Sequence, residues 1–296
     1  MRVNPNFAPD LLTDLSNIEV QEQTDMQQLA TGQSINMPSD NPASFAANIE
    51  NLAEQKQTDQ YLQNTSTLEG MFQTADSSLS TIVTALNQAV SLGVEGGNSD
   101  LSPSDLQALA EQVQGIQGQV VSLANASYEG TYLFAGTANT TPFTLDSTQP
   151  SGVRYNGNNG VNNVEIAGGR TIQSNLPGNQ IFLGASGNIM GSLQQLITAL
   201  QSGNTTNIAN ATTQVSGALG YLSQQRVFYG SAVEQLNANQ SFLQQETVNL
   251  QTQQNSLVGA DIATVATNLN QAQTAQSAAL AAIAKVIPES LLDYLK

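Results

Sequence analysis

The chain has 296 residues, and its 23 acidic and 7 basic residues give a formal net charge of −16. It contains no Cys and no His, which excludes disulfides, thiolate chemistry, histidine acid–base catalysis and the usual zinc ligands. Clustered Lys and Arg that could bind phosphate are lacking, so neither nucleic acid nor an anionic membrane surface is an expected partner.

The first predicted helix covers residues 4–35 and carries a weak apolar stripe. Two carboxylates, Glu22 and Asp25, interrupt this stripe, so the helix is marginal by itself. Gly32 marks its end. The stripe consists of Leu11, Leu15, Ile18 and Leu29.

A loop at residues 37–42 precedes a second helical region. Asp40 or Asn41 can cap the new helix, and Pro42 suits its first position. A cation held by Asp40 is the alternative, but a cap explains both polar residues. Apolar residues at helical spacing return after a polar stretch, and residues 95–98 end the helix. The returning stripe consists of Leu68, Phe72, Ala75, Leu79, Ile82 and Leu86.

The next helix has the clearest signal in the chain. Ser102, Pro103 and Asp105 form a capping-box sequence with proline in the first turn. A short link predicts that this helix folds back antiparallel on the preceding one. Its apolar positions follow strict three-four spacing: Leu106, Leu109, Val113, Ile116, Val120 and Leu123.

Residues 128–183 are rich in Gly, Asn, Thr and Pro and predict a small β domain inserted between helices. Strands are expected at residues 132–134 and 164–166, with turns at Asn156-Gly157 and Asn159-Gly160. The pair Gly168-Gly169 fits a turn better than a phosphate-binding loop, whose spacing it lacks. Few core contacts are expected to cross the borders of this insert, which would make it separable.

Helix returns near Ile189, and a long heptad pattern follows Gly203. A seven-residue repeat keeps one helix edge facing a partner. The companion positions are mixed, because Leu219 and Val233 are apolar but Arg226 and Gln240 are not, so this seam needs packing partners. Every seventh residue is apolar: Ile208, Val215, Leu222, Tyr229, Leu236, Leu243, Leu250 and Leu257.

Gly259 interrupts the seam, and a last stripe begins with Ile262 and continues to Ile283 before an apolar tail. The chain is therefore predicted to be mainly α with a small β insert. Both chain ends should contribute to an elongated antiparallel helical bundle or coiled-coil core. The acidic residues are interpreted as solvated helix faces, because nothing brings two of them together, and no catalytic, cofactor-binding or metal-binding residue is predicted.

Several motifs resemble the flagellin superfamily. Residues 29–36 (LATGQSIN) and 38–43 (PSDNPA) resemble its N-terminal signature, and residues 226–231 (RVFYGS) resemble its C-terminal one. A second set is similar to the members that join hook to filament: residues 130–137 (GTYLFAGT), 141–143 (TPF), 154–157 (RYNG) and 175–182 (NLPGNQIF). Asp40-Asn41 departs from the usual Asp-Asp of flagellins, which favours a junction protein over a filament protein.

This resemblance implies a non-enzymatic structural subunit that joins hook to filament at the distal end of the bacterial hook. A filament flagellin is the alternative, and a secreted adhesin or effector is a more distant one. The implied partners are other copies of the chain, a neighbouring hook-associated protein, flagellin and an export chaperone. Residues 1–20 hold no apolar core of a cleaved signal, which by itself would predict a cytosolic protein. The resemblance overrides this expectation and implies the extracellular flagellum, reached by type III export without cleavage.

The resemblance also implies three parts. Residues 1–40 with 258–296 form terminal polymerisation helices that are disordered in the monomer, residues 41–130 with 188–257 a helical rod core, and residues 131–187 the β domain. The polymer interface expected on the terminal helices comprises Leu11, Leu15, Ile18, Leu29, Ile262, Val265, Leu269, Leu280, Ile283, Leu292 and Leu295.

Overall fold

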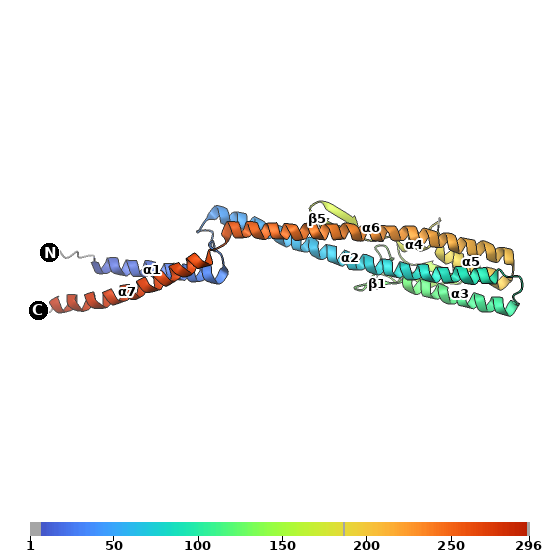
Figure 1. Ribbon diagram of the computed structural model, residues 1–296, viewed down its shortest axis with the longest axis horizontal. Helices are drawn as coiled ribbons and strands as arrows, with labels where there is room; N and C mark the ends of the chain where they lie inside the picture. The colour runs from blue at the N-terminus through green and yellow to red at the C-terminus, as the bar shows by residue number, and fades with distance from the viewer. Residues whose placement is uncertain (1–6, 186, 295–296) are drawn as a thin grey trace. The chain divides into compact units, whose positions relative to one another are not determined.

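The computed structural model describes residues 7–185 and 187–294, and the chain divides into two compact units (Figure 1). Unit 1 combines Met1–Gln57 with Gln245–Lys296, and unit 2 is Thr58–Gln244. Two long helices, α2 (Pro42–Gly96) and α6 (Thr205–Val258), contribute residues to both units. The predicted mainly helical class with a small β region is confirmed, and long helices from both chain ends pack together.

Helix α2 continues without a break through the polar stretch that precedes Leu68. The reason is a heptad row in which polar residues take the place of apolar ones toward the N-terminus but stay buried. Asn51 donates to the carbonyl of Leu250 at 3.2 Å, so at least this polar position is satisfied inside the structure. The buried row consists of Asn51, Thr58, Thr65, Phe72, Leu79, Leu86 and Gly93.

The predicted seam of α6 is confirmed, since its members from Ile208 to Leu250 are buried and Leu257 is half-buried. The companion row differs from the prediction. Leu219, Val233 and the polar positions of that row are only half-buried, whereas buried residues lie three positions after the main row. They are Ala211, Ala218, Ala232 and Asn239. Small side chains allow a close approach of neighbouring elements, which explains why the half-polar row is not the tightly packed one.

Helix α3 (Pro103–Ala124) begins with the predicted capping box: Ser102 Oγ accepts from Asp105 N at 3.3 Å, and Asp105 Oδ2 accepts from Ser102 N at 3.2 Å. The short link turns the chain back, so that α3 lies beside α2, and α5 (Ile189–Ser202) packs on α3 (Figure 1). Fully buried side chains in this part of unit 2 include Val113, Val120, Leu193 and Leu196.

The β region forms three antiparallel two-stranded sheets. β1 (Ser127–Tyr128) pairs with β2 (Thr131–Tyr132), β3 (Phe143–Leu145) with β4 (Val153–Tyr155), and β5 (Asn163–Ala167) with β6 (Arg170–Gln173). The strand predicted at residues 164–166 is confirmed. Of residues 132–134 only Tyr132 is in a strand, because Leu133 and Phe134 leave the hairpin to enter the core.

The two-residue hairpin turns follow Tyr128 and Ala167, whereas residues 146–152 form the longer connection from β3 to β4. Glu129 and Gly130 both have positive φ, 49° and 80°, as a two-residue hairpin turn with right-handed strand twist requires. The predicted turn Gly168-Gly169 joins β5 to β6. The Asn-Gly pairs at residues 156–160 instead lie in the connection between β4 and β5, which belong to different sheets.

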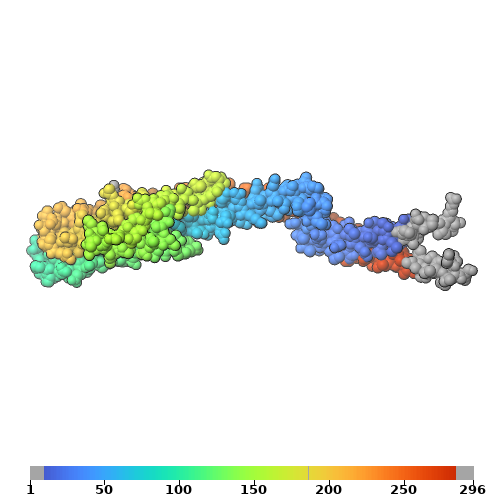
Figure 2. Space-filling view, turned by 180° about the vertical axis from the view of Figure 1, so that it is seen from behind, coloured from blue at the N-terminus to red at the C-terminus, as the bar shows by residue number. Residues whose placement is uncertain are grey.

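The expectation that few core contacts cross the borders of the β region is wrong. Phe134, Phe143 and Phe182 belong to the same buried cluster as Leu79 and Leu193 of the helices. Figure 2 shows residues of this region, green to yellow, covering helices of the same unit. Two-stranded sheets bury too little by themselves, so their apolar faces need the helices. The three-part division of the chain remains a prediction.

Replacing Phe143 by Ala should therefore unfold helices as well as strands at a lower temperature. Truncating a buried Phe costs about 3–5 kcal/mol. Leu145 lies on the same strand, is 64% exposed, and provides the matched control. Leu145→Ala should change stability by about 0.5 kcal/mol or less. Thermal unfolding followed by far-UV circular dichroism tests this, and an unchanged helical transition in Phe143→Ala would contradict the shared core.

Candidate functional site

The two end helices of the chain, α1 (Phe7–Thr31) and α7 (Ile262–Tyr294), lie side by side in unit 1 (Figure 1). Shortly after the last residue of α1 and before the first residue of α7, an antiparallel bridge joins Gln33 to Gly259. Ser34 N donates to the carbonyl of Val258 at 2.7 Å, and Ala260 N donates to the carbonyl of Gly32 at 3.0 Å. Backbone bonds thus tie together segments that are more than two hundred residues apart in sequence.

The predicted interface residues on α1 lie on the stripe that the sequence indicates. Leu11, Leu15 and Ile18 are half-buried, and Leu29 is 39% exposed. Asp25, which was predicted to interrupt this stripe, is the most buried described side chain of the helix, at 2% exposed. The pairing of α1 therefore covers its apolar residues only in part.

The predicted residues on α7 fall into two groups. Val265 is buried, and Leu269 and Ile283 are half-buried, which places them on the covered side. Ile262 and Leu280 are 46% and 51% exposed. Leu292 lies within α7, but its side chain is outside the described part, and Leu295 lies outside the described residues altogether.

Exposed apolar side chains on α1 were missed by the sequence analysis. Leu12, Val20 and Met26 are 56%, 61% and 48% exposed. They lie outside the stripe of Leu11, Leu15 and Ile18, so helical periodicity gave no signal for them. Together with the exposed apolar residues of α7, they leave apolar surface of unit 1 uncovered by the pairing of the two helices.

Polar side chains in the loops next to these helices accept hydrogen bonds from backbone N–H groups. Asp40 Oδ2 accepts from Asn36 N and Met37 N at 3.0 and 2.9 Å, and Asn41 Oδ1 accepts from Ser44 N as the N-cap of α2. Hydrogen bonds from the Met37 and Asn36 backbone lower the pKa of Asp40. In structural terms the PSDNPA motif is thus a loop closed by Asp40, followed by a helix cap at Asn41.

Asp261 performs the same role for α7. Its Oδ1 accepts from Ala263 N and Thr264 N at 3.0 and 3.3 Å, and its Oδ2 accepts from the Thr264 hydroxyl at 2.9 Å. The hydroxyl bond from Thr264, followed by the backbone bonds, lowers the pKa of Asp261. A negative charge at this position also interacts favourably with the helix dipole.

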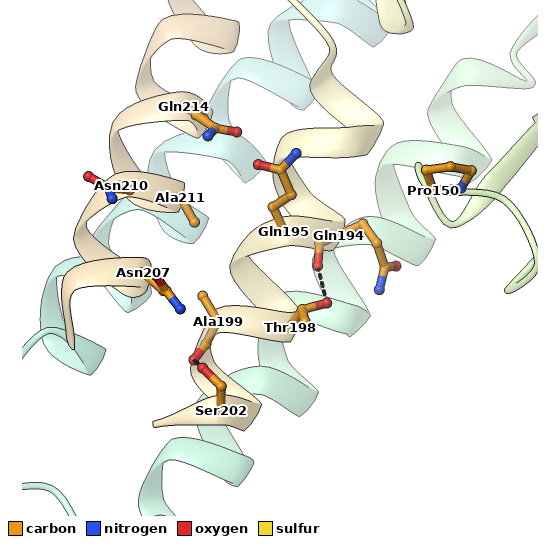
Figure 3. A pocket seen from close by; sticks show the side chains of 10 residues that line it. All are labelled: Pro150, Gln194, Gln195, Thr198, Ala199, Ser202, Asn207, Asn210, Ala211 and Gln214. Atoms are coloured by element: carbon orange, nitrogen blue, oxygen red, sulfur yellow. Dashed lines mark hydrogen bonds between the residues drawn. The ribbon is translucent and has the colours of Figure 1, made fainter. Parts of the chain in front are cut away.

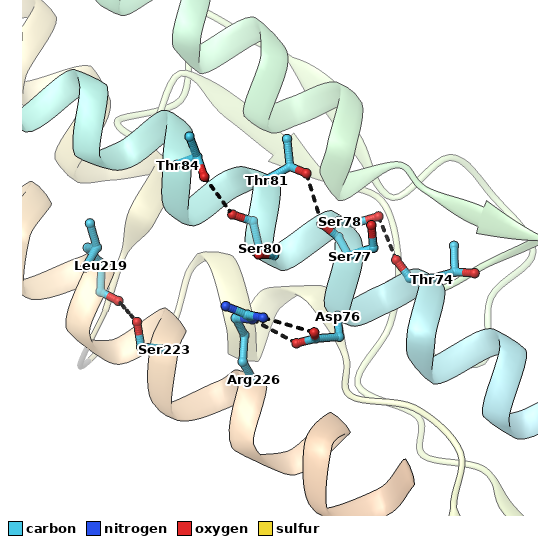
Figure 4. Close-up of polar contacts among 10 residues, drawn as sticks. All are labelled: Thr74, Asp76, Ser77, Ser78, Ser80, Thr81, Thr84, Leu219, Ser223 and Arg226. Carbon is cyan, nitrogen blue, oxygen red and sulfur yellow. Dashed lines mark hydrogen bonds and ion pairs between the residues drawn. The ribbon is translucent and has the colours of Figure 1, made fainter.

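The RVFYGS motif lies on α6 and links it to α2 (Figure 4). Arg226 Nε and Nη2 donate to the two carboxylate oxygens of Asp76 at 2.8 and 2.9 Å, a bidentate pair. The Phe72 ring packs edge-on against Phe228 and Tyr229, with centroids 6.1 and 5.8 Å apart. Burial raises the pKa of the Tyr229 phenol. This motif therefore contributes to packing within unit 2.

The second set of motifs meets at one aromatic cluster. The carbonyl of Phe134 accepts from Gly178 N at 2.8 Å and from the Tyr155 hydroxyl at 3.0 Å. The ring centroid of Phe182 lies 5.3 Å from the ring centroids of both Phe134 and Phe143. A Cβ at Gly178 would lie 2.6 Å from the Phe134 carbonyl oxygen, so this close approach requires glycine. The separated motifs are thus parts of one packing unit.

A polar groove of about 440 Å³ lies between α5 and α6 (Figure 3). Amide side chains dominate its lining, among them Gln194, Asn207 and Asn210. Its hydroxyls already donate within their own helix, Thr198 to the Gln194 carbonyl and Ser202 to the Ala199 carbonyl. No ionisable side chain lines the groove, so it offers hydrogen bonds but neither a general acid nor a general base.

The described residues contain no group of three or more carboxylates, His or Cys arranged to hold a metal ion. Every helix among them is too short or too polar to cross a bilayer.

The two ends of the chain match models of protein families. The model described as the bacterial flagellin N-terminal helical region matches residues 6–139, and that described as the bacterial flagellin C-terminal helical region matches residues 212–295. Together the matched regions cover well over half of the chain, including all of α1 and all of α7.

Curated relatives and solved structures carry related names. The chain is similar to flagellar hook-associated protein 3 of Salmonella typhimurium, with 31% identity over 158 residues, 53% of this chain and 48% of that protein. The protein of the same name from Escherichia coli is 34% identical over 124 residues, 40% and 38% of the two chains. The matched part thus spans less than half the length of these relatives.

A crystal structure of flagellar hook-associated protein 3 from Legionella pneumophila has a TM-score of 0.63 and 14% identity, and the likeness covers 70% of this chain and 98% of that one. At this identity the likeness shows a shared fold.

The backbone hydrogen bonds that Asp40 and Asp261 accept predict a defined acid sensitivity for unit 1. Because the folded-state pKa of each lies below the ordinary value of 3.8, their stabilisation is complete above that value and is lost as the pH falls through the lowered pKa. Carboxyl NMR titration of Asp261 should give a midpoint below 3.8. Asp261→Asn keeps a capping oxygen and should remove the acid dependence of amide exchange at Ala263 and Thr264. A midpoint at or above the ordinary value would contradict the cap.

Proposed function

We propose that this chain, which belongs to the bacterial flagellin family, is a structural subunit that joins the hook to the filament at the distal hook–filament junction. The observation that carries the proposal is the similarity of the chain to flagellar hook-associated protein 3 at more than 30% identity. The convergence of residues 130–137, 154–157 and 175–182 on one aromatic cluster supports it, because these are the segments that resemble junction proteins.

The end helices are the proposed polymer interface. Their seam is thin, and large apolar side chains such as Leu12, Val20 and Leu280 remain exposed in a single subunit. Exposed apolar surface of this kind is usual where another protein packs. In this proposal residues 1–40 and 258–296 are unpaired in the free subunit and fold against neighbouring subunits, and residues 131–187 face outward. Limited proteolysis of the monomer should then trim it to about residues 45–255, because the thin stripes on either side bury too little apolar surface to offset the chain entropy.

The proposed location is the extracellular flagellum, reached through the type III export apparatus without cleavage of a signal. The proposed partners are copies of this chain, a neighbouring hook-associated protein, flagellin and an export chaperone. A low density of charged residues, 10% of the chain, supports close packing of like subunits despite the net charge of −16. No catalytic role is proposed.

Antibody labelling of isolated flagella tests the location directly. A single band at the boundary of hook and filament is expected. Label along the whole filament would instead identify a filament subunit, and absence of label from flagella would overturn both assignments.

A pair of substitutions tests the polymer role. Leu269→Asp puts a charge into the proposed assembled interface, where loss of a buried leucine costs about 2–5 kcal/mol and an unpaired carboxylate adds to that. The variant should be exported, keep the melting temperature of the monomer and fail to join the hook. Val113→Asp places the same group in the fully buried core of unit 2 and should lower the melting temperature or prevent folding.

The contrast between these two variants is the measurement. Equal loss of stability at both positions would indicate that α7 is an ordinary part of a folded core. A junction that still carries filament in Leu269→Asp flagella would show that α7 is not the buried interface.

A further inference from the structure

A buried carboxylate lies in the seam between the end helices. The side chain of Asp25 is 2% exposed, although its neighbours on the same stripe, Leu11, Leu15 and Ile18, are only half-buried. Gln21 Nε2 donates to Asp25 Oδ1 at 2.9 Å, while Asp25 Oδ2 has no hydrogen-bond partner among the described residues. The most deeply buried described side chain of α1 is thus a carboxylate with one oxygen that accepts no hydrogen bond from the described residues.

The opposite helix offers nothing that would compensate this charge. Counting equal numbers of residues from the Gln33–Gly259 bridge brings Asp25 level with residues 265–269 of α7. Val265 is buried there, and Leu269 is half-buried. Residues 262–284, the part of α7 whose side chains are described, include no basic residue at all. The charged neighbours of Asp25 on α1 itself, Glu19 and Glu22, are both acidic.

Burial of an ionised carboxylate without a counter-charge opposes the packing that buries it, because the lost hydration is not replaced. A single polar residue at a seam position is also a known way to weaken one helix pairing in favour of another. We propose that Asp25 keeps α1 and α7 of a free subunit from closing firmly on each other, so that the end helices stay available to neighbouring subunits.

The availability of the end helices to neighbouring subunits rests on the proposed function. The effect of Asp25 on the pairing of α1 with α7 does not, because it occurs in the isolated subunit. The paired helices in the structure are the closed state, and Asp25 sets how often that state opens. Substitution by Asn removes the charge at nearly constant shape, and substitution by Leu also removes the polar group. Both changes should favour the closed state.

Hydrogen–deuterium exchange of the full-length monomer at neutral pH measures this opening segment by segment. Asp25→Asn and Asp25→Leu should each slow amide exchange in α1 and in residues 262–284 by about tenfold or more relative to the unchanged chain. Asp14→Asn is the matched control, because Asp14 lies on the same helix and is exposed. It should leave these rates unchanged. Exchange in α3, within unit 2, reports that every variant is folded.

Two outcomes would overturn the proposal. The first is that both Asp25 variants exchange at the same rate as Asp14→Asn. The second is that the end helices of the unchanged chain are already as protected as those of the variants. Antibody label along the whole filament would refute the junction assignment while leaving the exchange result intact, so the two failures are distinguishable.

Discussion

The fold depends on one heptad row, the line of α6 residues from Ile208 to Leu250 that faces the matching row of α2. Toward the end of α2 that contains Leu79 and Leu86 the row is apolar, and each fully buried side chain there contributes about 1.5–3 kcal/mol. Toward Asn51 the α2 row is polar, although the α6 row stays apolar as far as Leu250. Side-chain hydrogen bonds, such as those from Asn51 to the Leu250 carbonyl and from Asn239 to the Thr65 hydroxyl, replace apolar contact there. Hydrogen bonds of this kind contribute about 1 kcal/mol net. The apolar part of the α2 row, which lies in unit 2, therefore stabilises the fold more than the polar part does, whereas the seven-residue spacing is the same along the whole row.

Periodic features of the fold could be predicted from the sequence, and features set by distant contacts could not. The heptads of α6 and the capping box at Ser102 are local patterns, and each is present as expected. The companion row was misplaced because a count of apolar residues favours Leu219 and Val233, while the packed positions hold alanines. Likewise, local turn chemistry favours the Asn-Gly pairs over Glu129-Gly130 as hairpin turns. Glu129-Gly130 nevertheless forms one and the Asn-Gly pairs do not, because the pairing of strands depends on their packing against helices.

The candidate interface was predictable in position but not in detail. The stripes of α1 and α7 identify which helices have unsatisfied apolar faces, and the covered residues Val265 and Leu269 follow from spacing. Exposure of Leu12 and Leu280, by contrast, depends on how two thin stripes meet. Asp25 could not be recognised as buried, because a carboxylate at a seam position is normally interpreted as an interruption. The interface therefore combines residues with a sequence signal and residues defined only by packing.

The bond between Ser34 and Val258 has a consequence for the order in which the chain acquires structure. Contacts of such large sequence separation form late, because the entropy of closing the intervening loop is lost before any contact compensates it. Whichever end of the chain emerges first from a ribosome or a secretion channel must wait for the other. Unit 2 also contains contacts of large sequence separation, such as that between Arg226 and Asp76, but these contacts require neither end of the chain. The two end helices can therefore pair only after both of them have emerged, so their pairing is the last step in the folding of the chain.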